Sequence, residues 1–197
     1  MKNTKKLVIL SLLTAIEIIF AFTVLGSIPL GPGIVATLAH LPPIIAATLL
    51  GKKEGFYMGC VFGFLSLIWW SFLGIAQPAA FAFTPLAQNG SFFSLIICLL
   101  PRMIYPVLTA IIYDWIYKLS KGKTSISATI SAGLGTILHS LMVFLLLYIF
   151  YNKHEIVGSN FLNLIIAWGG INAIMEIIVA MIINGALITA LKKVHIK

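Results

Sequence analysis

Long apolar segments separated by short basic connections restrict most strongly how this chain can fold. The hydrocarbon core of a bilayer requires about 20 consecutive apolar residues for each helix that crosses it. Six helices are expected near residues 7–25, 38–50, 55–73, 92–118, 125–151 and 163–191, of which the second is short and begins at "HLPP". With 60% hydrophobic and 9% charged residues, the chain is too apolar for a soluble domain. We predict an all-α membrane protein, a six-transmembrane-helix bundle that forms a single membrane domain over residues 1–197.

The connections between these helices alternate in composition. Eleven of the thirteen Lys and Arg residues lie in four basic segments, at residues 1–6, 51–55, 117–125 and 192–197. The segments at 26–37, 74–91 and 151–160 are longer and richer in Gly, Pro, Ser and Asn. Because cytoplasmic loops carry the excess of Lys and Arg, we expect both termini in the cytoplasm and the longer loops outside, capping a ligand pocket. The net charge of +8 is then a topology signal, and no nucleic-acid partner is indicated.

Arg102 lies within the fourth apolar segment, in "LLPRMIYPV" (residues 99–107), between Pro101 and Pro106. A charge at membrane depth costs roughly 3 kcal/mol or more, so such residues usually serve a function. Arginine keeps its proton and binds carboxylates with two parallel hydrogen bonds. We expect Arg102 to anchor an anionic ligand. The alternative is a salt bridge to Glu17 or Glu176.

Trp168, Asn172 and Glu176 are spaced four residues apart in the last apolar segment and therefore share one helix face. An aromatic ring, an amide and a carboxylate could form one wall of a pocket, since ligand pockets are mainly apolar with a few polar groups. Alternatively, Asn172 and Glu176 form hydrogen bonds between helices.

Three further substrate-binding candidates lie towards the expected outer side: His40 before the second helix, Trp70 near the end of the third, and Asn89 in a long loop. An aromatic belt at the membrane surface would also explain Trp70.

Small residues recur at four-residue steps and predict close helix packing. They are Gly51, Gly55, Gly59 and Gly63 in the third helix, and Ser127, Ser131 and Gly135 in the fifth. Ser11 and Ala15 form a similar notch in the first helix, which either packs within the bundle or docks a partner subunit.

Motifs for phosphate binding, nucleophilic hydrolysis or metal binding are absent from the sequence. No catalytic residue, metal or cofactor is therefore expected, although an intramembrane enzyme with His139 and Glu176 as acid and base is an alternative. Without an ATP site, a substrate-capturing subunit that obtains its energy from other subunits fits better.

The stretch "IPLGPGIVATLAHLPPIIAATLLGKKEGFYMGCVFGFLSL" (28–67), followed by "LPRMIYPVLTAIIYDWIY" (100–117), resembles the substrate-binding S component of energy-coupling factor (ECF) vitamin transporters. The pattern is A-T-L-A-H-L-P, then L-L-G-x-x-x-G and F-G-x-x-S, with P-R opening the fourth helix. The resemblance implies a six-helix bundle in a bacterial cell membrane that binds a vitamin near the outer face, beneath loops that close over it.

The resemblance also implies partners: a transmembrane coupling subunit and two cytoplasmic ATPases, with small residues of the first helix contacting the coupling subunit. In this sequence Ser11 and Ala15 occupy those positions. The pantothenate branch is favoured, with Arg102 holding the carboxylate and Asn172 taking other polar groups. Riboflavin, folate and a queuosine precursor remain alternatives.

Overall fold

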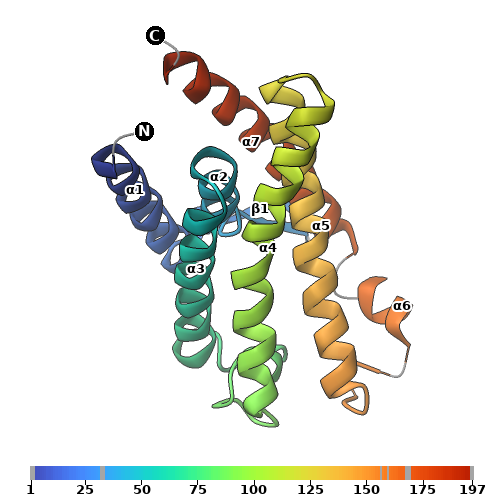
Figure 1. Cartoon of the computed structure of the whole chain (residues 1–197). Coiled ribbons are helices and arrows are strands. Elements are labelled where there is room, and N and C mark those ends of the chain that lie inside the picture. The colour runs from blue at the N-terminus through green and yellow to red at the C-terminus, as the bar shows by residue number, and fades with distance from the viewer. Residues whose placement is uncertain (1–2, 32–33, 156, 159, 167–169, 196–197) are drawn as a thin grey trace.

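The computed structural model describes residues 3–31, 34–155, 157–158, 160–166 and 170–195, and consists mainly of long helices (Figure 1). In chain order the helices are α1 (Asn3–Phe22), α2 (Leu41–Leu50), α3 (Lys52–Phe72), α4 (Phe92–Leu119), α5 (Thr124–Tyr151), α6 (Phe161–Leu164) and α7 (Gly170–His195). Short 3-10 turns, η1 (Val24–Gly26) and η2 (Ala80–Ala82), lie in the connections after α1 and α3.

Four helices in the described part of the chain are long and apolar enough to cross a membrane: Lys52–Phe72, Phe92–Leu119, Thr124–Tyr151 and Asn172–Leu191. The chain is therefore a multi-pass membrane protein. The presence of two further spans, which would make six, stays a prediction. α1 has 20 residues but carries Lys5, Lys6 and Glu17. The ten residues of α2 extend about 15 Å, which is half of a bilayer core. Residues 41–48 of α2 are all buried, so this helix belongs to the core of the bundle.

The last predicted helix, 163–191, spans two helices of the structure. The described residues of this region form the short helix α6 and the long helix α7, and residues 167–169 between them lie outside the described part. Asn160 caps α6 by accepting hydrogen bonds from the main-chain N–H groups of Leu162 and Asn163.

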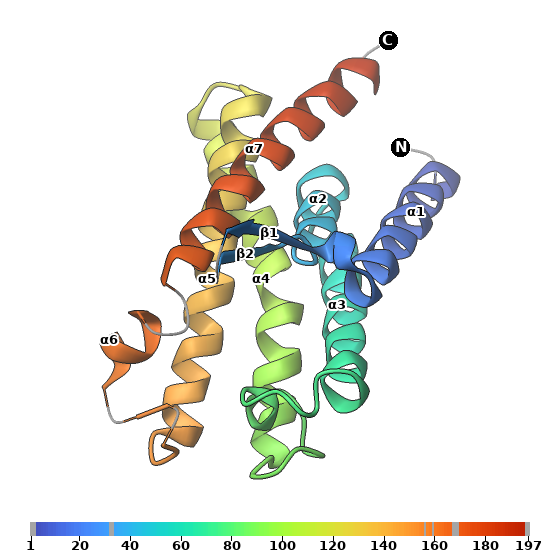
Figure 2. The ribbon, with the colours of Figure 1, turned by 180° about the vertical axis from the view of Figure 1, so that it is seen from behind.

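The predicted loop at 26–37 contains two strands, β1 (Ser27–Gly31) and β2 (Ile34–Thr37), which pair antiparallel. Ser27 pairs with Thr37 and Pro29 with Val35, and the register is irregular between Pro29 and Gly31. Both strands are edge strands, where a proline is tolerated. The ribbon crosses the bundle at about half its height, between the end of α1 and α7 (Figure 2).

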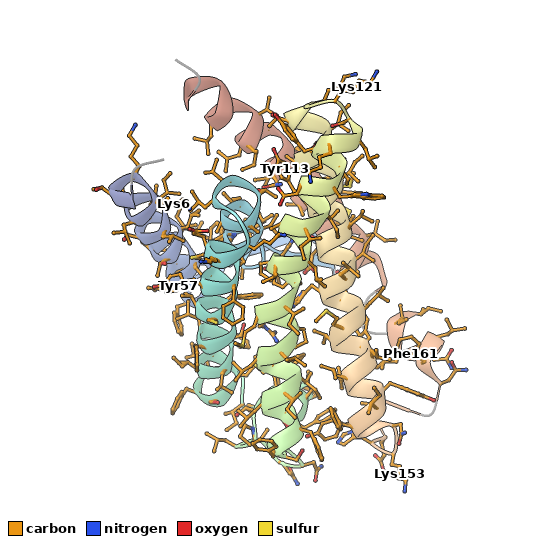
Figure 3. The ribbon with its side chains drawn as sticks, viewed as in Figure 1. Lys6, Tyr57, Tyr113, Lys121, Lys153 and Phe161 are labelled. Atoms are coloured by element: carbon orange, nitrogen blue, oxygen red, sulfur yellow. The ribbon has the colours of Figure 1, made fainter. Side chains whose placement is uncertain are left out.

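The ends of the bundle separate the two classes of connection. Both termini and the link between α4 and α5 lie at one end, while the link from α3 to α4 and the link after α5 lie at the other (Figure 1). Lys121 and Lys153 mark these opposite ends (Figure 3). Two of the three polar connections thus lie at the end opposite the termini, whereas the third, at 26–37, contains the ribbon at about half the height of the bundle (Figure 2).

Small residues allow the central helices to approach closely, as the four-residue repeats predict. A side chain on Gly55 would meet Ala47 of α2, and one on Gly59 would meet the main-chain oxygen of Arg102 on α4. On α5, Gly135 packs against the Thr109 side chain of α4 in the same way. Pro106 has no N–H for the Arg102 carbonyl four residues earlier, yet α4 continues through both Pro101 and Pro106.

Candidate functional site

A cavity of about 540 Å³ lies between the end of α1, the start of α2 and the facing sides of α3, α4, α5 and α7. This volume is within the range of small-molecule sites. Four of the seven predicted ligand contacts line the cavity: His40, Trp70, Arg102 and Glu176. His139 lines it as well.

Arg102 is 7% exposed and carries the permanent positive charge of the cavity wall. Its Nη1 donates to the main-chain oxygen of Cys98 at 2.7 Å, and its Nε is buried with no hydrogen-bond partner. The guanidinium carbon lies 5.2 Å from the ring centre of Phe62 and 5.3 Å from that of Phe83, within cation–π range. Among the described residues, the ion pair that forms joins Lys6 to Glu54, and Arg102 takes no part in it. Arg102 is therefore not held by a protein carboxylate, contrary to the salt-bridge alternative.

Two histidines line the same cavity: His40, which directly precedes α2, and His139 of α5. The Nε2 atoms of His40 and His139 are buried without a hydrogen-bond partner. The Tyr105 hydroxyl donates to the main-chain oxygen of His40 at 2.8 Å, and the Tyr105 ring lies 4.7 Å from the His139 ring. Tyr105 therefore fixes the positions of both histidines, whose free nitrogens can bind hydroxyl or amide groups.

Glu176 lines the cavity but is already occupied by a protein partner. One of its carboxylate oxygens accepts hydrogen bonds from the main-chain N–H of Thr37, at 3.2 Å, and from the Thr37 hydroxyl. This contact joins the end of β2 to α7. Glu176 thus holds the ribbon at the cavity.

Aromatic side chains form one wall of the cavity. Trp69 and Trp70 both line it, with ring centres 5.0 Å apart in an edge-to-face arrangement. Trp70 also stacks on Phe83 from the connection after α3, at 4.9 Å. A membrane-surface belt does not account for this inward packing.

Two of the remaining predicted contacts, Asn89 and Asn172, are not brought to the cavity. Asn89 is exposed in the connection before α4, with a left-handed main chain at φ 64°. Asn172, four residues before Glu176 on α7, is not among the lining residues, and Trp168 lies outside the described residues. The predictions missed several lining residues: Phe20, Thr37, Phe62 and Ser66. The spacing of Phe62, Ser66 and Trp70, four residues apart, could have identified this face of α3.

A second hollow, of about 620 Å³, lies between α1 and the start of α3. Ser11 and Ala15 line it from α1, both with exposed side chains, opposite Lys53 and Tyr57 of α3. Figure 3 shows Lys6 and Tyr57 on this side of the molecule, and Lys6 pairs with Glu54 at 2.7 Å across the two helices. The small-residue notch of α1 is thus open at the surface of the described structure.

A multi-pass helical membrane protein with an arginine-bearing internal cavity and no metal-binding cluster among its described residues is typical of a membrane transport component. Residues 5–189 match the family model described as "ECF transporter, substrate-specific component", and the chain belongs to this family. It is therefore a transport component and not an enzyme. A similar curated protein is the pantothenic acid transporter PanT of Lactococcus lactis subsp. cremoris, which is 29% identical over 165 residues, covering 80% of this chain and 78% of the relative.

Proposed function

We propose that this protein captures pantothenate outside a bacterial cell and delivers it to an ECF transport module. The observation that carries this proposal is Arg102, a buried guanidinium in the cavity wall with no protein carboxylate bound to it. Pantothenate offers one carboxylate, two hydroxyls and an amide. The similarity to a pantothenic acid transporter favours this vitamin over riboflavin, folate or a queuosine precursor.

Each proposed contact matches one kind of chemical group in pantothenate. Arg102 binds the carboxylate, and the free Nε2 atoms of His40 and His139 bind the hydroxyl and amide groups. Trp70 and Phe62 cover the apolar part of the ligand. Glu176 acts through Thr37, because its carboxylate would repel an anionic ligand.

The proposed orientation places both termini in the cytoplasm. The basic connections lie at the end of the bundle that holds the termini, and cytoplasmic segments carry the excess of Lys and Arg. In this arrangement the whole chain is one membrane domain of six helices, and the β1–β2 ribbon and the link after α3 close the cavity from outside.

The proposed partners are a transmembrane coupling subunit and two cytoplasmic ATPases. The exposed notch of Ser11 and Ala15 near the basic end of α1 is the surface we assign to the coupling subunit. Small residues permit the close helix approach that such docking requires.

Calorimetric titration of the purified protein with pantothenate, riboflavin and folate tests the function. We expect pantothenate to bind with a Kd of roughly micromolar or lower. Arg102→Gln should weaken this binding by about 3 kcal/mol, roughly a hundredfold, because a buried charge contact is lost. Lys153→Gln, which removes a cation at one end of the bundle, is the matched control and should bind normally. Absence of pantothenate binding, or unchanged binding by Arg102→Gln, contradicts the proposal.

A further inference from the structure

Phe83 belongs to the connection between α3 and α4, outside both helices, and is only 8% exposed. The centre of its ring lies 5.3 Å from the guanidinium carbon of Arg102, within cation–π range. Phe83 is not among the residues that line the cavity. It therefore contacts the proposed anion-binding side chain without being a contact of the ligand itself.

The segment that carries this ring, residues 80–84, is fixed to both neighbouring helices. All five of its residues are buried. The hydroxyl of Thr84 lies 2.7 Å from that of Ser71 near the end of α3, and the hydroxyl of Ser94 at the start of α4 donates to the main-chain oxygen of Phe81 at 2.6 Å. The ring that contacts the guanidinium thus has a defined position relative to both helices.

Arg102 needs such support because an arginine side chain is long and has many rotamers. A carboxylate is bound with two parallel hydrogen bonds only when the guanidinium plane has the right orientation. Ordering a flexible side chain at the moment of binding costs affinity, and this cost is removed when the side chain is already held in the unbound protein. The hydrogen bond to Cys98 restrains one end of the guanidinium, and the rings of Phe62 and Phe83 restrain its plane.

We propose that Phe83 is a positioning residue for anion recognition, which holds the Arg102 guanidinium in the geometry that binds a ligand carboxylate. This inference rests on the proposed function and gives the connection after α3 a part in selecting a charged ligand over a neutral one. Phe83 also stacks on Trp70, at 4.9 Å, and Trp70 lines the cavity. An effect transmitted through Trp70 would be the same for charged and neutral ligands, so the two routes can be separated.

Phe83→Leu keeps an apolar side chain and removes the ring. The probes are pantothenate and pantothenol, in which a hydroxymethyl group replaces the carboxylate. In calorimetric titrations we expect Phe83→Leu to bind pantothenate about fivefold more weakly, the cost of ordering one long side chain on binding, and to bind pantothenol normally. In an Arg102→Gln background, Phe83→Leu should not weaken pantothenate binding any further, because the side chain through which it acts is gone.

Phe81→Leu is the matched control, because Phe81 is a buried ring of the same segment that stacks on His154 instead, at 3.9 Å. It should lower the Tm and leave the ratio of the two affinities unchanged. If Phe83→Leu fails to fold, as judged by its melting curve, pentafluorophenylalanine at position 83 makes the same test. It keeps the shape of the ring but removes the electron-rich face that attracts a cation, and should give the same selective loss.

The inference is overturned if pantothenate binding is unchanged or tighter, or if both ligands lose affinity equally. It is also overturned if Phe81→Leu gives the same selective loss, or if the loss from Phe83→Leu persists in the Arg102→Gln background. Each of these results leaves pantothenate capture intact. If the unaltered protein does not bind pantothenate, both proposals fail.

Discussion

Gly59 on α3 lies directly against the main-chain carbonyl of Arg102 on α4, so closely that no side chain would fit between them. Pro106 leaves this carbonyl without its helical partner. The glycine therefore determines how far α4 lies from α3, and with it the position of the Arg102 guanidinium.

Substitution of Gly59 by Ala should separate α3 from α4. We expect a loss of about 1–3 kcal/mol in stability, typical of overpacking, and weaker pantothenate binding. Thermal unfolding in detergent and titration measure the two effects. Gly63→Ala is the control: its Cβ would meet the Leu99 side chain at 3.2 Å, which can move, so the loss should be smaller. If the two variants lose the same stability, the contact between Gly59 and the Arg102 carbonyl does not determine the helix spacing.

Replacement of Arg102 by Lys should not preserve the site. The guanidinium lies over the Phe62 and Phe83 rings and donates to Cys98, and an ammonium group cannot reproduce this planar arrangement. We expect a loss of about tenfold or more in pantothenate affinity, measured by calorimetry. Lys153→Arg, the reverse exchange outside the cavity, should have no effect. If Arg102→Lys binds pantothenate as tightly as the unaltered protein, a positive charge without the planar guanidinium is sufficient for binding.

Thr37→Val should loosen the ribbon from α7. The substitution removes the hydroxyl that donates to Glu176, and hydrogen bonds to a charged group contribute about 1.5–3 kcal/mol. Bound pantothenate should dissociate at least fivefold faster in a stopped-flow displacement experiment. Thr189→Val, which removes a hydroxyl bonded within α7 to Gly185, should leave the rate unchanged. An unaltered rate in Thr37→Val would argue against a tether at the cavity.

Asn184 joins three helices, and its loss should affect stability without affecting the ligand. Its side chain accepts from the Thr48 hydroxyl at 3.1 Å and donates to the main-chain oxygen of Ala128 at 2.8 Å. Asn184→Leu removes both hydrogen bonds between helices, each contributing about 0.5–1.5 kcal/mol, so we expect about 1–3 kcal/mol of destabilisation and a lower Tm. The exposed Asn163 provides the control, Asn163→Leu. A changed pantothenate affinity with an unchanged Tm would contradict the structural assignment.

Tyr151→Phe should release the connection that precedes α4. The Tyr151 hydroxyl lies 2.7 Å from the hydroxyls of both Ser91 and Ser94, and Ser94 donates to the main-chain oxygen of Phe81. Loss of about 1 kcal/mol should give roughly fivefold faster amide exchange in residues 81–91, measured by mass spectrometry. Tyr57→Phe, at an exposed ring, is the control. Exchange that stays at the original rate would exclude this hydroxyl as the anchor.

The sequence was most informative where a residue type conflicts with its surroundings. Arg102 stands out because lipid does not tolerate an unneeded charge, and the glycine repeat of α3 has a direct meaning in helix packing. The β1–β2 ribbon was missed because its short strands contain glycine and proline and lack a clear alternating pattern. Asn89 was chosen for its side-chain chemistry, but the path of a loop depends on tertiary contacts that no local pattern records.

One helix, α1, contributes to both hollows of the molecule: Phe20 and Ala21 line the cavity at one end, and Ser11 and Ala15 line the open groove at the other. A helix moves largely as a rigid rod. A partner that tilts α1 from the groove side would therefore also displace Phe20 and Ala21, so that an event at the protein surface changes the wall of the internal cavity.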